Sequence, residues 1–228
     1  SGHGRMARSR SPTLSQSGQQ VKALELNYRL QSEVAGMLVE KPSGDVPHAK
    51  RDIDVLWVNN IRQFKRPDLS LDLAASMPGV SFHLVGGPIE PELYEQIKRR
   101  AESLQNVTFH GPISYKQIGE FYDRCRVFLN TSDIEGFPNS YLQAWVRGRP
   151  VVTFFDPDGL IRREGLGQAV TTLEEMRTAL RFYLDKESAL EEVGARCRDY
   201  MSVKYGDDIV LQPYLEMIER LVPHATTP

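Results

Sequence analysis

Between residues 54 and 155, short apolar segments alternate with segments of helical pattern, and this alternation limits the possible folds more than any other feature. Strands are expected at 55–58, 81–85, 107–111, 126–130 and 150–155. Helices are expected at 69–77, 91–104, 115–125, 139–148, 172–184, 187–204 and 207–221. Strands that alternate with helices form a parallel sheet with helices on both faces. Because such crossovers are right-handed, the sequence predicts a Rossmann-like, doubly wound α/β fold with a helical C-terminus.

The sequence outside this alternation predicts four parts. Residues 1–20 are rich in Ser, Gly, Gln and Arg and contain no acid, so we expect a disordered tag or linker. A transit peptide is the alternative, although the segment has no amphipathic pattern. Residues 21–50 are expected to form a helix, at 21–40, and then a linker. The Rossmann-like domain would occupy 51–222, and 223–228 would be a tail.

Composition excludes several classes of protein. With 28 Lys and Arg against 30 Asp and Glu, the net charge is −2, which does not favour nucleic acid as a partner. The apolar runs are far shorter than the roughly 18 residues of a membrane span. Two cysteines are too few for a disulfide scaffold, and we expect them to be reduced and buried. The histidines share no metal-ligand spacing with each other or with the cysteines, so no metal is expected, and His83 and His110 should be core or surface residues. Trp57 and Trp145 are expected in the core.

Ligands of parallel α/β sheets bind beyond the carboxyl ends of the strands, so the residues that follow each strand are candidates. After the first strand, Arg62 and Lys65 lie on a loop that feeds a helix. A charge-assisted hydrogen bond from either one to a phosphate would be worth about 1.5–3 kcal/mol. The alternative is a solvated basic loop. After the second strand, Gly86 and Gly87 permit close approach of the backbone to a ligand, or form a plain turn.

The strongest candidate is the segment 131–152. Glu135 precedes a helix that begins near Pro138, Asn139 and Ser140, and the free N–H groups of a helix start favour an anion. A carboxylate beside an anion site suits a ligand that carries hydroxyls as well as phosphate. Gln143 lies one to two turns further along the same helix, within reach of the same cleft.

This segment resembles the E-G-F-G-x-x-x-x-E-A-x-A-x-G-x-P-V signature of GT-B glycosyltransferases of family 4. The matching residues are Glu135-Gly136-Phe137-Pro138, Gln143-Ala144 and Gly148-Arg149-Pro150-Val151. Further motifs agree in the same order, at Arg62…Lys65-Arg66-Pro67-Asp68, Val85-Gly86-Gly87 and Asn106-Val107-Thr108-Phe109-His110-Gly111. The resemblance runs from about residue 53 to 221 and is to the C-terminal, donor-binding half of a two-domain enzyme. The N-terminal, acceptor-binding domain would be missing from this chain.

The resemblance implies a retaining, metal-independent hexosyltransferase that takes a nucleotide-diphospho-sugar as donor and needs no cofactor. Arg62 and Lys65 would bind the diphosphate and Glu135 the donor-sugar hydroxyls. The remaining donor-site residues would be Gly86, Gly87, Pro112, Ile113, Gly136, Phe137, Pro138, Asn139, Ser140 and Gln143. The backbone around Gly111–Ile113 would contact the base, and the amides around Phe137–Ser140 would assist at the diphosphate. The acceptor would be a glycan, a lipid-linked sugar or a protein.

Two departures from the family pattern keep an alternative open. Gln143 stands where the family has a second glutamate, and Asn59-Asn60 stands where it has Gly-Arg, unless Arg62 substitutes for that arginine. The alternative is a non-catalytic, GT-B-like interaction module with a degenerate donor site. As a donor-binding half, the chain should be inactive alone, and the resemblance implies a cytoplasmic location.

Two other segments are open to two interpretations each. The basic run Lys98–Arg100 is interpreted as a solvated helix face, with contact to the inner face of a membrane as the other interpretation. The turn Asp156–Gly159 follows the fifth strand, and its carboxylates could instead meet sugar hydroxyls.

Overall fold

The computed structural model describes residues 50–221 together with 14–15, 22, 25–26, 33–34 and 39–42. Near the N-terminus, strand β1 (Leu14–Ser15) pairs in parallel with β2 (Glu33–Val34). Disorder was expected for 1–20 and a helix for 21–40. The two strands depart from this at Leu14–Ser15 and Glu33–Val34, whereas Lys22, Glu25 and Leu26 are helical as predicted. Val34 is β-branched and a glycine follows at position 36, and both residue types lower helix propensity. The other N-terminal predictions fall largely, and the tail at 223–228 entirely, outside the described residues.

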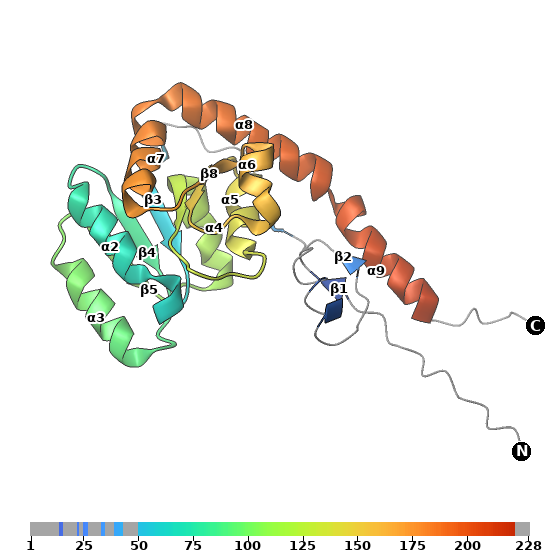
Figure 1. The fold of residues 1–228 in the computed structure, drawn as a ribbon, viewed down its shortest axis with the longest axis horizontal. Helices are drawn as coiled ribbons and strands as arrows, with labels where there is room; N and C mark the ends of the chain where they lie inside the picture. Colours follow the sequence, from blue (N-terminus) through green and yellow to red (C-terminus); the bar gives the residue numbers. More distant parts are fainter. Residues whose placement is uncertain are drawn as a thin grey trace, which may run out of the picture.

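Six parallel strands form the central sheet, in the order β5–β4–β3–β6–β7–β8 (Figure 1). They are β3 (Ile53–Val58), β4 (Phe82–Val85), β5 (Val107–Gly111), β6 (Cys125–Asn130), β7 (Val151–Thr153) and β8 (Gly167–Ala169). Numbered from β3, this is the 3-2-1-4-5-6 order of the Rossmann fold. The predicted fold class is confirmed, and the chain order reverses between β3 and β6, which lie side by side.

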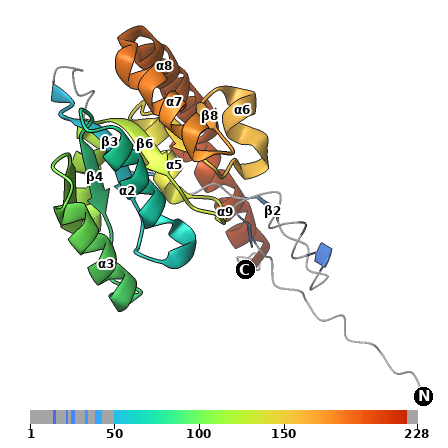
Figure 2. The same cartoon turned by 60° about the vertical axis from the view of Figure 1, so that its left-hand side comes forward.

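Helices cover both faces of this sheet (Figure 2). They are α2 (Pro67–Ser76), α3 (Pro91–Glu102), α4 (Tyr115–Arg124), α5 (Asn139–Val146), α6 (Leu160–Glu164), α7 (Leu173–Asp185) and α8 (Glu187–Lys204). Single 3₁₀ turns lie at Gln63–Lys65 and Pro157–Gly159, and the last helix is α9 (Asp207–Leu221). One core packs α2, α3 and α7 against the sheet and contains Trp57. The other packs α4, α5, α6 and α8 against the opposite face and contains Trp145. Both tryptophans lie in the core as expected.

Both cysteines are free and buried in the second core, as expected. Burial in apolar surroundings raises the pKa of the Cys125 thiol to about 12, so this thiol is not reactive. The last helix, α9, extends away from the sheet and exposes Ile209, Leu215 and Ile218 (Figure 1). Within the described part of the chain, no helix combines the length and the apolar character that a bilayer crossing requires.

Strand β8 and helix α6 are absent from the prediction. The sequence of β8 is Gly-Gln-Ala, which carries no β-branched or aromatic residue. A Cβ atom at Gly167 would lie 1.9 Å from the carbonyl oxygen of Val151, and the φ of Gly167 is +149°. Glycine therefore lets this short strand come close enough to pair with β7, and strand propensity gives no sign of it.

Candidate functional site

Two adjoining hollows lie beyond the carboxyl ends of β3, β4, β5 and β6, and both are lined by Asn59 and Asn60. The first, called here the charged hollow, has a volume of about 480 Å³ and is also lined by Arg62, Phe64, Lys65, Ile134, Glu135 and Gly136. The second, the uncharged hollow, has a volume of about 360 Å³. Its walls include the predicted residues Gly86, Gly87, Pro112, Ile113, Asn139, Ser140 and Gln143. This is the edge of the sheet at which the parallel fold predicts a ligand.

Lys65 and Glu135 form an ion pair in the charged hollow, with 2.6 Å between Lys65 Nζ and Glu135 Oε2. Asn130 Nδ2 donates a hydrogen bond to the other carboxylate oxygen, Oε1, at 3.2 Å. The Lys65 side chain is 15% exposed and that of Glu135 is 10% exposed. The two residues follow β3 and β6, which are neighbours in the sheet although 70 residues separate the pair in sequence. The structure therefore brings the predicted cation and the predicted carboxylate together.

Arg62 adds a second cation to the charged hollow. Its guanidinium lies 5.8 Å from the centre of the Phe64 ring, and Lys65 Nζ lies 5.2 Å from the same ring. Such cation–π contacts are worth about 0.5–1 kcal/mol at exposed sites. Among the described residues, no carboxylate pairs with Arg62. The hollow therefore has two cations and one carboxylate, an excess of positive charge that suits an anion.

The two glycines after β4 shape the wall between the hollows. A Cβ atom at Gly86 would lie 1.9 Å from the carbonyl oxygen of Asn59, and one at Gly87 would lie 3.3 Å from Asn60 Oδ1. The loop after β3 is fixed there by backbone hydrogen bonds, from Asn59 N to Val85 O at 3.1 Å and from Ile61 N to Gly87 O at 2.9 Å. The close approach at Gly86 is thus to a neighbouring loop. Neither Gly86 nor Gly87 has a positive φ, whereas Gly111, at the end of β5, has a φ of 66°.

The start of helix α5 contributes to both hollows, but not through every predicted residue. Gly136 lines the charged hollow, while Asn139 and Ser140 line the uncharged one. The side chains of Phe137 and Pro138 line neither, because Phe137 packs against the second core and Pro138 is buried at the N-cap of α5. For Phe137 the predicted role of the backbone amide remains open, whereas Pro138 has no backbone N–H to donate.

Gln143 lines the uncharged hollow, and it also makes a contact that the sequence analysis did not predict. Arg147, one turn along α5, donates from Nη1 to Gln143 Oε1 at 2.7 Å. Arg147 also pairs with Asp123 at 2.8 Å, and only 4% of its side chain is exposed. Because a guanidinium can only donate, the carbonyl end of the Gln143 amide must face Arg147. The spacing of four residues between Gln143 and Arg147 was the available signal.

One polar atom at the junction of the two hollows has no partner. Asn59 Nδ2 is buried and has no hydrogen-bond partner among the described residues. Asn59 lines both hollows. An unsatisfied buried donor costs about 1–3 kcal/mol, and a ligand acceptor would relieve that cost.

The segments with two interpretations lie away from both hollows. Asp156 accepts a hydrogen bond from Ile161 N at 2.7 Å and so caps helix α6, as expected of a structural turn. Within the basic run on α3, Arg100 pairs with Asp72. The half-buried His83 and His110 lie on adjacent strands with 3.0 Å between Nδ1 and Nε2, a contact that was not predicted. In the described part of the chain, no three His, Cys, Asp or Glu residues form a group that could hold a metal ion.

Comparisons with known proteins place this chain in a family. Residues 53–184 match the family model for glycosyl transferases group 1, which is more than half of the chain. The O-antigen biosynthesis glycosyltransferase WbnH of Escherichia coli is 32% identical over 98 residues, which are 43% of this chain and 27% of WbnH. The alpha-galactosylglucosyldiacylglycerol synthase of Streptococcus pneumoniae is 25% identical over 170 residues, 73% of this chain and 45% of that protein. The matches thus span less than half the length of each of these relatives.

Solved structures support the fold. A variant of S. aureus TarM, determined with fondaparinux, alpha-GlcNAc-glycerol and UDP, matches with a TM-score of 0.76 at 18% identity, covering 91% of this chain and 43% of that one. HepE from Anabaena, in complex with UDP-glucose, matches with a TM-score of 0.75 at 15% identity, covering 92% of this chain and 63% of that one. The Rossmann-like sheet with its helical C-terminus is the arrangement that these two structures share with the chain. This chain belongs to the group 1 glycosyltransferases.

Proposed function

We propose that the chain is the donor-binding half of a retaining, metal-independent glycosyltransferase of GT-B family 4, of hexosyltransferase type. A nucleotide-diphospho-sugar would lie across the two hollows, with its diphosphate and sugar in the charged one and its nucleoside in the uncharged one. The observation that carries this proposal is the Lys65–Glu135 pair at 2.6 Å in a hollow that also contains Arg62.

The charged hollow would supply the donor side of a sugar transfer from a diphosphate. When the bond to the sugar breaks, negative charge develops on the departing diphosphate, and Arg62 and Lys65 would stabilise it in place of a metal ion. Backbone amides at the start of α5 would add donors there. Glu135 would accept hydrogen bonds from sugar hydroxyls and so orient the anomeric carbon. On ligand binding Lys65 would turn from Glu135 to phosphate, which frees the carboxylate for those hydroxyls.

The uncharged hollow suits a nucleoside. Its walls combine apolar side chains and backbone, at Ile113 and Gly87 for example, with the side-chain amides of Asn59, Asn60, Asn139 and Gln143. Backbone at Pro112 and Ile113 would contact the base. Gln143 would face the ribose, with its amide nitrogen free to donate because Arg147 occupies its carbonyl oxygen. The unpartnered Asn59 Nδ2 would find an acceptor on the ligand.

The proposal that a second domain is missing rests on length and on one exposed surface. The matched parts of the relatives and solved structures cover 27–63% of their lengths. Helix α9 exposes an apolar face at Leu211, Leu215 and Ile218, spaced i, i+4 and i+7, which a further domain would cover. The active site would be incomplete without that domain, so the chain alone should bind donor and transfer nothing.

The acceptor is proposed from the relatives. One relative is named for O-antigen biosynthesis and another as a glycosyldiacylglycerol synthase, which favours a glycan or lipid-linked acceptor over a protein. Such an acceptor would place the enzyme in the cytoplasm at the inner face of the membrane. The exposed basic residues Lys98 and Arg99 on α3 are suited to peripheral contact with an anionic bilayer.

Isothermal titration calorimetry with UDP-, GDP- and ADP-sugars in excess chelator tests the proposal. We expect one donor to bind at one site per chain, and Glu135→Ala to weaken the sugar nucleotide more than the free nucleoside diphosphate. Lys98→Ala, on the exposed face of α3, is the matched control and should change neither. No binding of any donor, with Glu135→Ala silent, would favour the non-catalytic interaction module.

A further inference from the structure

The residue that follows Lys65 has an unusual backbone conformation. Arg66 has φ 49° and ψ 52°, the left-handed region that residues other than glycine disfavour. It lies between the 3₁₀ turn Gln63–Lys65 and the first residue of α2. A strained residue persists only where its surroundings hold it, and such positions concentrate at functional sites.

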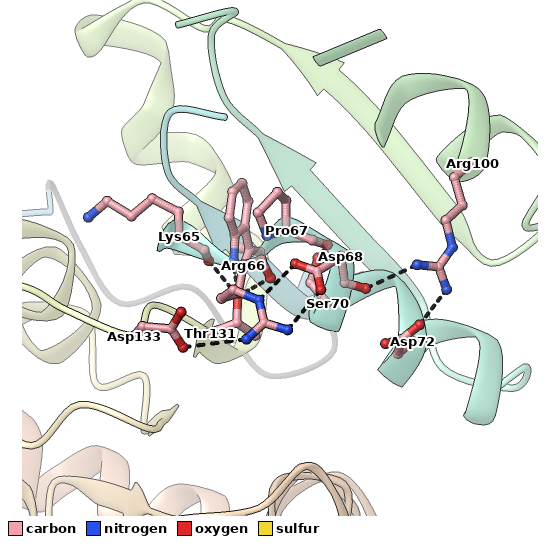
Figure 3. Close-up of polar contacts among 10 residues, drawn as sticks. Lys65, Arg66, Pro67, Asp68, Ser70, Asp72, Arg100, Thr131 and Asp133 are labelled. Carbon is pink, nitrogen blue, oxygen red and sulfur yellow. Dashed lines mark hydrogen bonds and ion pairs between the residues drawn. The ribbon is translucent and has the colours of Figure 1, made fainter. Parts of the chain in front are cut away.

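The Arg66 side chain is held by two carboxylates (Figure 3). Its Nε and Nη2 donate to the two oxygens of Asp68 at 3.1 and 2.9 Å, and its Nη1 lies 3.5 Å from Asp133 Oδ1. Asp68 belongs to α2, whereas Asp133 belongs to the loop after β6 that also contains Glu135. The Arg66 guanidinium therefore joins the loop that contains Arg62 and Lys65 to the loop that contains Glu135.

The buried hydroxyl of Thr131 also binds the loop that contains Lys65 and Arg66. Thr131 Oγ1 accepts a hydrogen bond from Trp57 Nε1 at 2.9 Å. Its own proton faces the carbonyl oxygens of Lys65 and Arg66, at 2.9 and 2.8 Å (Figure 3). The backbone of Asp133 adds a third link by donating to Phe64 O at 2.9 Å.

Neither Thr131 nor Arg66 lines the charged hollow or the uncharged one. Thr131 binds the carbonyl oxygens of Lys65 and Arg66, and the Arg66 guanidinium binds Asp133 in the other loop. The Lys65 side chain reaches Glu135 across the gap between the two loops. We propose that Thr131 and Arg66 are positioning residues that fix the loop 62–66 to the loop 131–136. They hold Lys65 Nζ in the charged hollow before an anion arrives. This inference rests on the proposed function for the identity of that anion, a diphosphate.

Arg66→Gly separates positioning from stability. Glycine suits the left-handed conformation, so we expect the unfolding equilibrium to be unchanged or improved. Without the guanidinium the loop is freer, and binding of inorganic pyrophosphate in chelator should weaken roughly three- to tenfold. A residue with a merely structural role would not improve stability while weakening binding, so pyrophosphate affinity equal to that of the native chain would overturn the role of Arg66.

Loss of the Arg66 charge could itself weaken an anion, and Asp68→Asn distinguishes the two causes. Removing an acid near an anion site strengthens binding if charge alone acts. If Asp68 orients Arg66, the same substitution weakens binding of pyrophosphate. Stronger binding by Asp68→Asn would overturn the positioning role of the guanidinium.

Thr131→Val and Thr131→Ser test the hydroxyl. Without this hydroxyl, Lys65 must be ordered when the anion binds, and we expect Thr131→Val to weaken pyrophosphate binding roughly tenfold. Thr131→Ser keeps the hydroxyl and should restore most of the affinity. Asn106→Ala is the control, because Asn106 Nδ2 donates to three backbone carbonyls away from both hollows. It should lower stability and leave pyrophosphate affinity unchanged.

A double-mutant cycle decides whether Thr131 acts through Lys65. In a Lys65→Met background, Thr131→Val should have little further effect on pyrophosphate binding, since the group it positions is gone. If the two effects on affinity multiply as independent ones do, the positioning role is overturned.

A ligand-free measurement separates this inference from the proposed function. The coupling between Lys65 and Glu135 can be measured by urea unfolding of Lys65→Met, Glu135→Gln and the double variant. We expect this coupling to fall toward zero when Thr131→Val or Arg66→Gly is present. If neither pyrophosphate nor UDP binds the native chain, the proposed function fails. If the coupling persists unchanged in both backgrounds, the positioning role fails.

Discussion

The charged hollow and the uncharged hollow share Asn59 and Asn60, yet they are built in opposite ways. The charged hollow is made from side chains of residues far apart in the chain, with Lys65 and Glu135 held at 2.6 Å. The residues that line the uncharged hollow carry no charge, and its walls combine apolar side chains and side-chain amides with the backbone at Gly86 and Gly87. Gly86 lies close against the backbone of Asn59. One substitution can change the charge of the charged hollow, whereas the shape of the uncharged hollow depends on the packing of three loops.

This difference indicates which part of one ligand each hollow would bind. Charge-assisted hydrogen bonds are worth about 1.5–3 kcal/mol each, about twice the value of neutral ones. Affinity for a nucleoside diphosphate should therefore come mainly from the charged hollow. The choice of nucleobase should come from the uncharged hollow, whose walls are fixed before binding.

The largest expected effect is that of Gly86→Ala on both hollows. A methyl group 1.9 Å from Asn59 O forces the loop after β3 to move, and we expect a loss of about 3 kcal/mol in the free energy of unfolding. Gly79→Ala is the matched control, since no atom lies within 4 Å of its Cβ position. Urea unfolding measures both variants. A Gly86→Ala variant as stable as the native chain would show that the shared wall is not rigid.

Lys65→Met should affect the charged hollow alone. It removes one cation and leaves the Glu135 carboxylate beside the diphosphate, so UDP binding should weaken roughly 30- to 100-fold, or about 2–3 kcal/mol. Calorimetry in chelator measures this loss. The affinity for the free nucleoside should stay the same, and equal weakening of nucleoside and diphosphate would mean that the two hollows do not act separately.

Acid should destabilise the sheet that supports both hollows. Burial and the neighbouring His110 lower the pKa of His83 to about 4. As the pH falls from 6.5 toward 4, the unfolded chain takes up a proton that the folded chain does not, so stability falls. Because His83 is only half-buried, we expect a loss of about 1–2 kcal/mol in this pH range. Urea unfolding of His83→Gln should show a smaller loss, and an unchanged pH dependence would contradict this cause.

Gln143→Glu should act on the uncharged hollow, with a smaller effect. One carboxylate oxygen would face Arg147, and the other would accept from a ribose hydroxyl in place of the donating Gln143 amide. An ionised acceptor forms the stronger hydrogen bond, so ribonucleoside diphosphate binding should strengthen several-fold, by about 1 kcal/mol. The matching 2′-deoxynucleotide should gain less. Equal gains for both nucleotides would contradict contact between residue 143 and the ribose.

Ionic strength should have the smallest effect on binding, and this effect should differ between the two hollows. Raising ionic strength from about 0.05 to 0.2 M should weaken pyrophosphate binding a few-fold, because two cations hold it in a partly exposed hollow. Binding of the free nucleoside should hardly change. If the affinity for the nucleoside fell with salt as steeply as the affinity for pyrophosphate, the uncharged hollow would have to contain a charge.

The sequence predicts the parts of this site that depend on strand order. Once a parallel sheet is expected, residues that follow neighbouring strands must meet at one edge, and Lys65 and Glu135 do so. The role predicted for the backbone amides around Phe137–Ser140 stays a prediction, and proximity to a helix start does not say which side chains face the hollow. Packing of Phe137 against the core decides that.

Other features depend on three-dimensional contacts that local patterns do not record. Strand β8 exists because Gly167 permits a close approach to β7. The left-handed Arg66 is held by carboxylates from α2 and from the loop after β6, where propensity alone favours glycine. Arg147 reaches Gln143 by helical spacing, but its burial against Asp123 follows from how α4 and α5 pack. Tertiary contact overrides local preference at each of these positions.

A crystal structure of this chain with UDP, grown in chelator, tests the central claim most directly. The two hollows should hold one nucleotide, with phosphate oxygens about 3 Å from Lys65 Nζ and near Arg62. The base should lie against Pro112 and Ile113, and Lys65 should have left Glu135. A nucleotide bound elsewhere, for example at the hollow lined by Arg162 and Thr171, or a Lys65–Glu135 pair unchanged beside it, would contradict the claim.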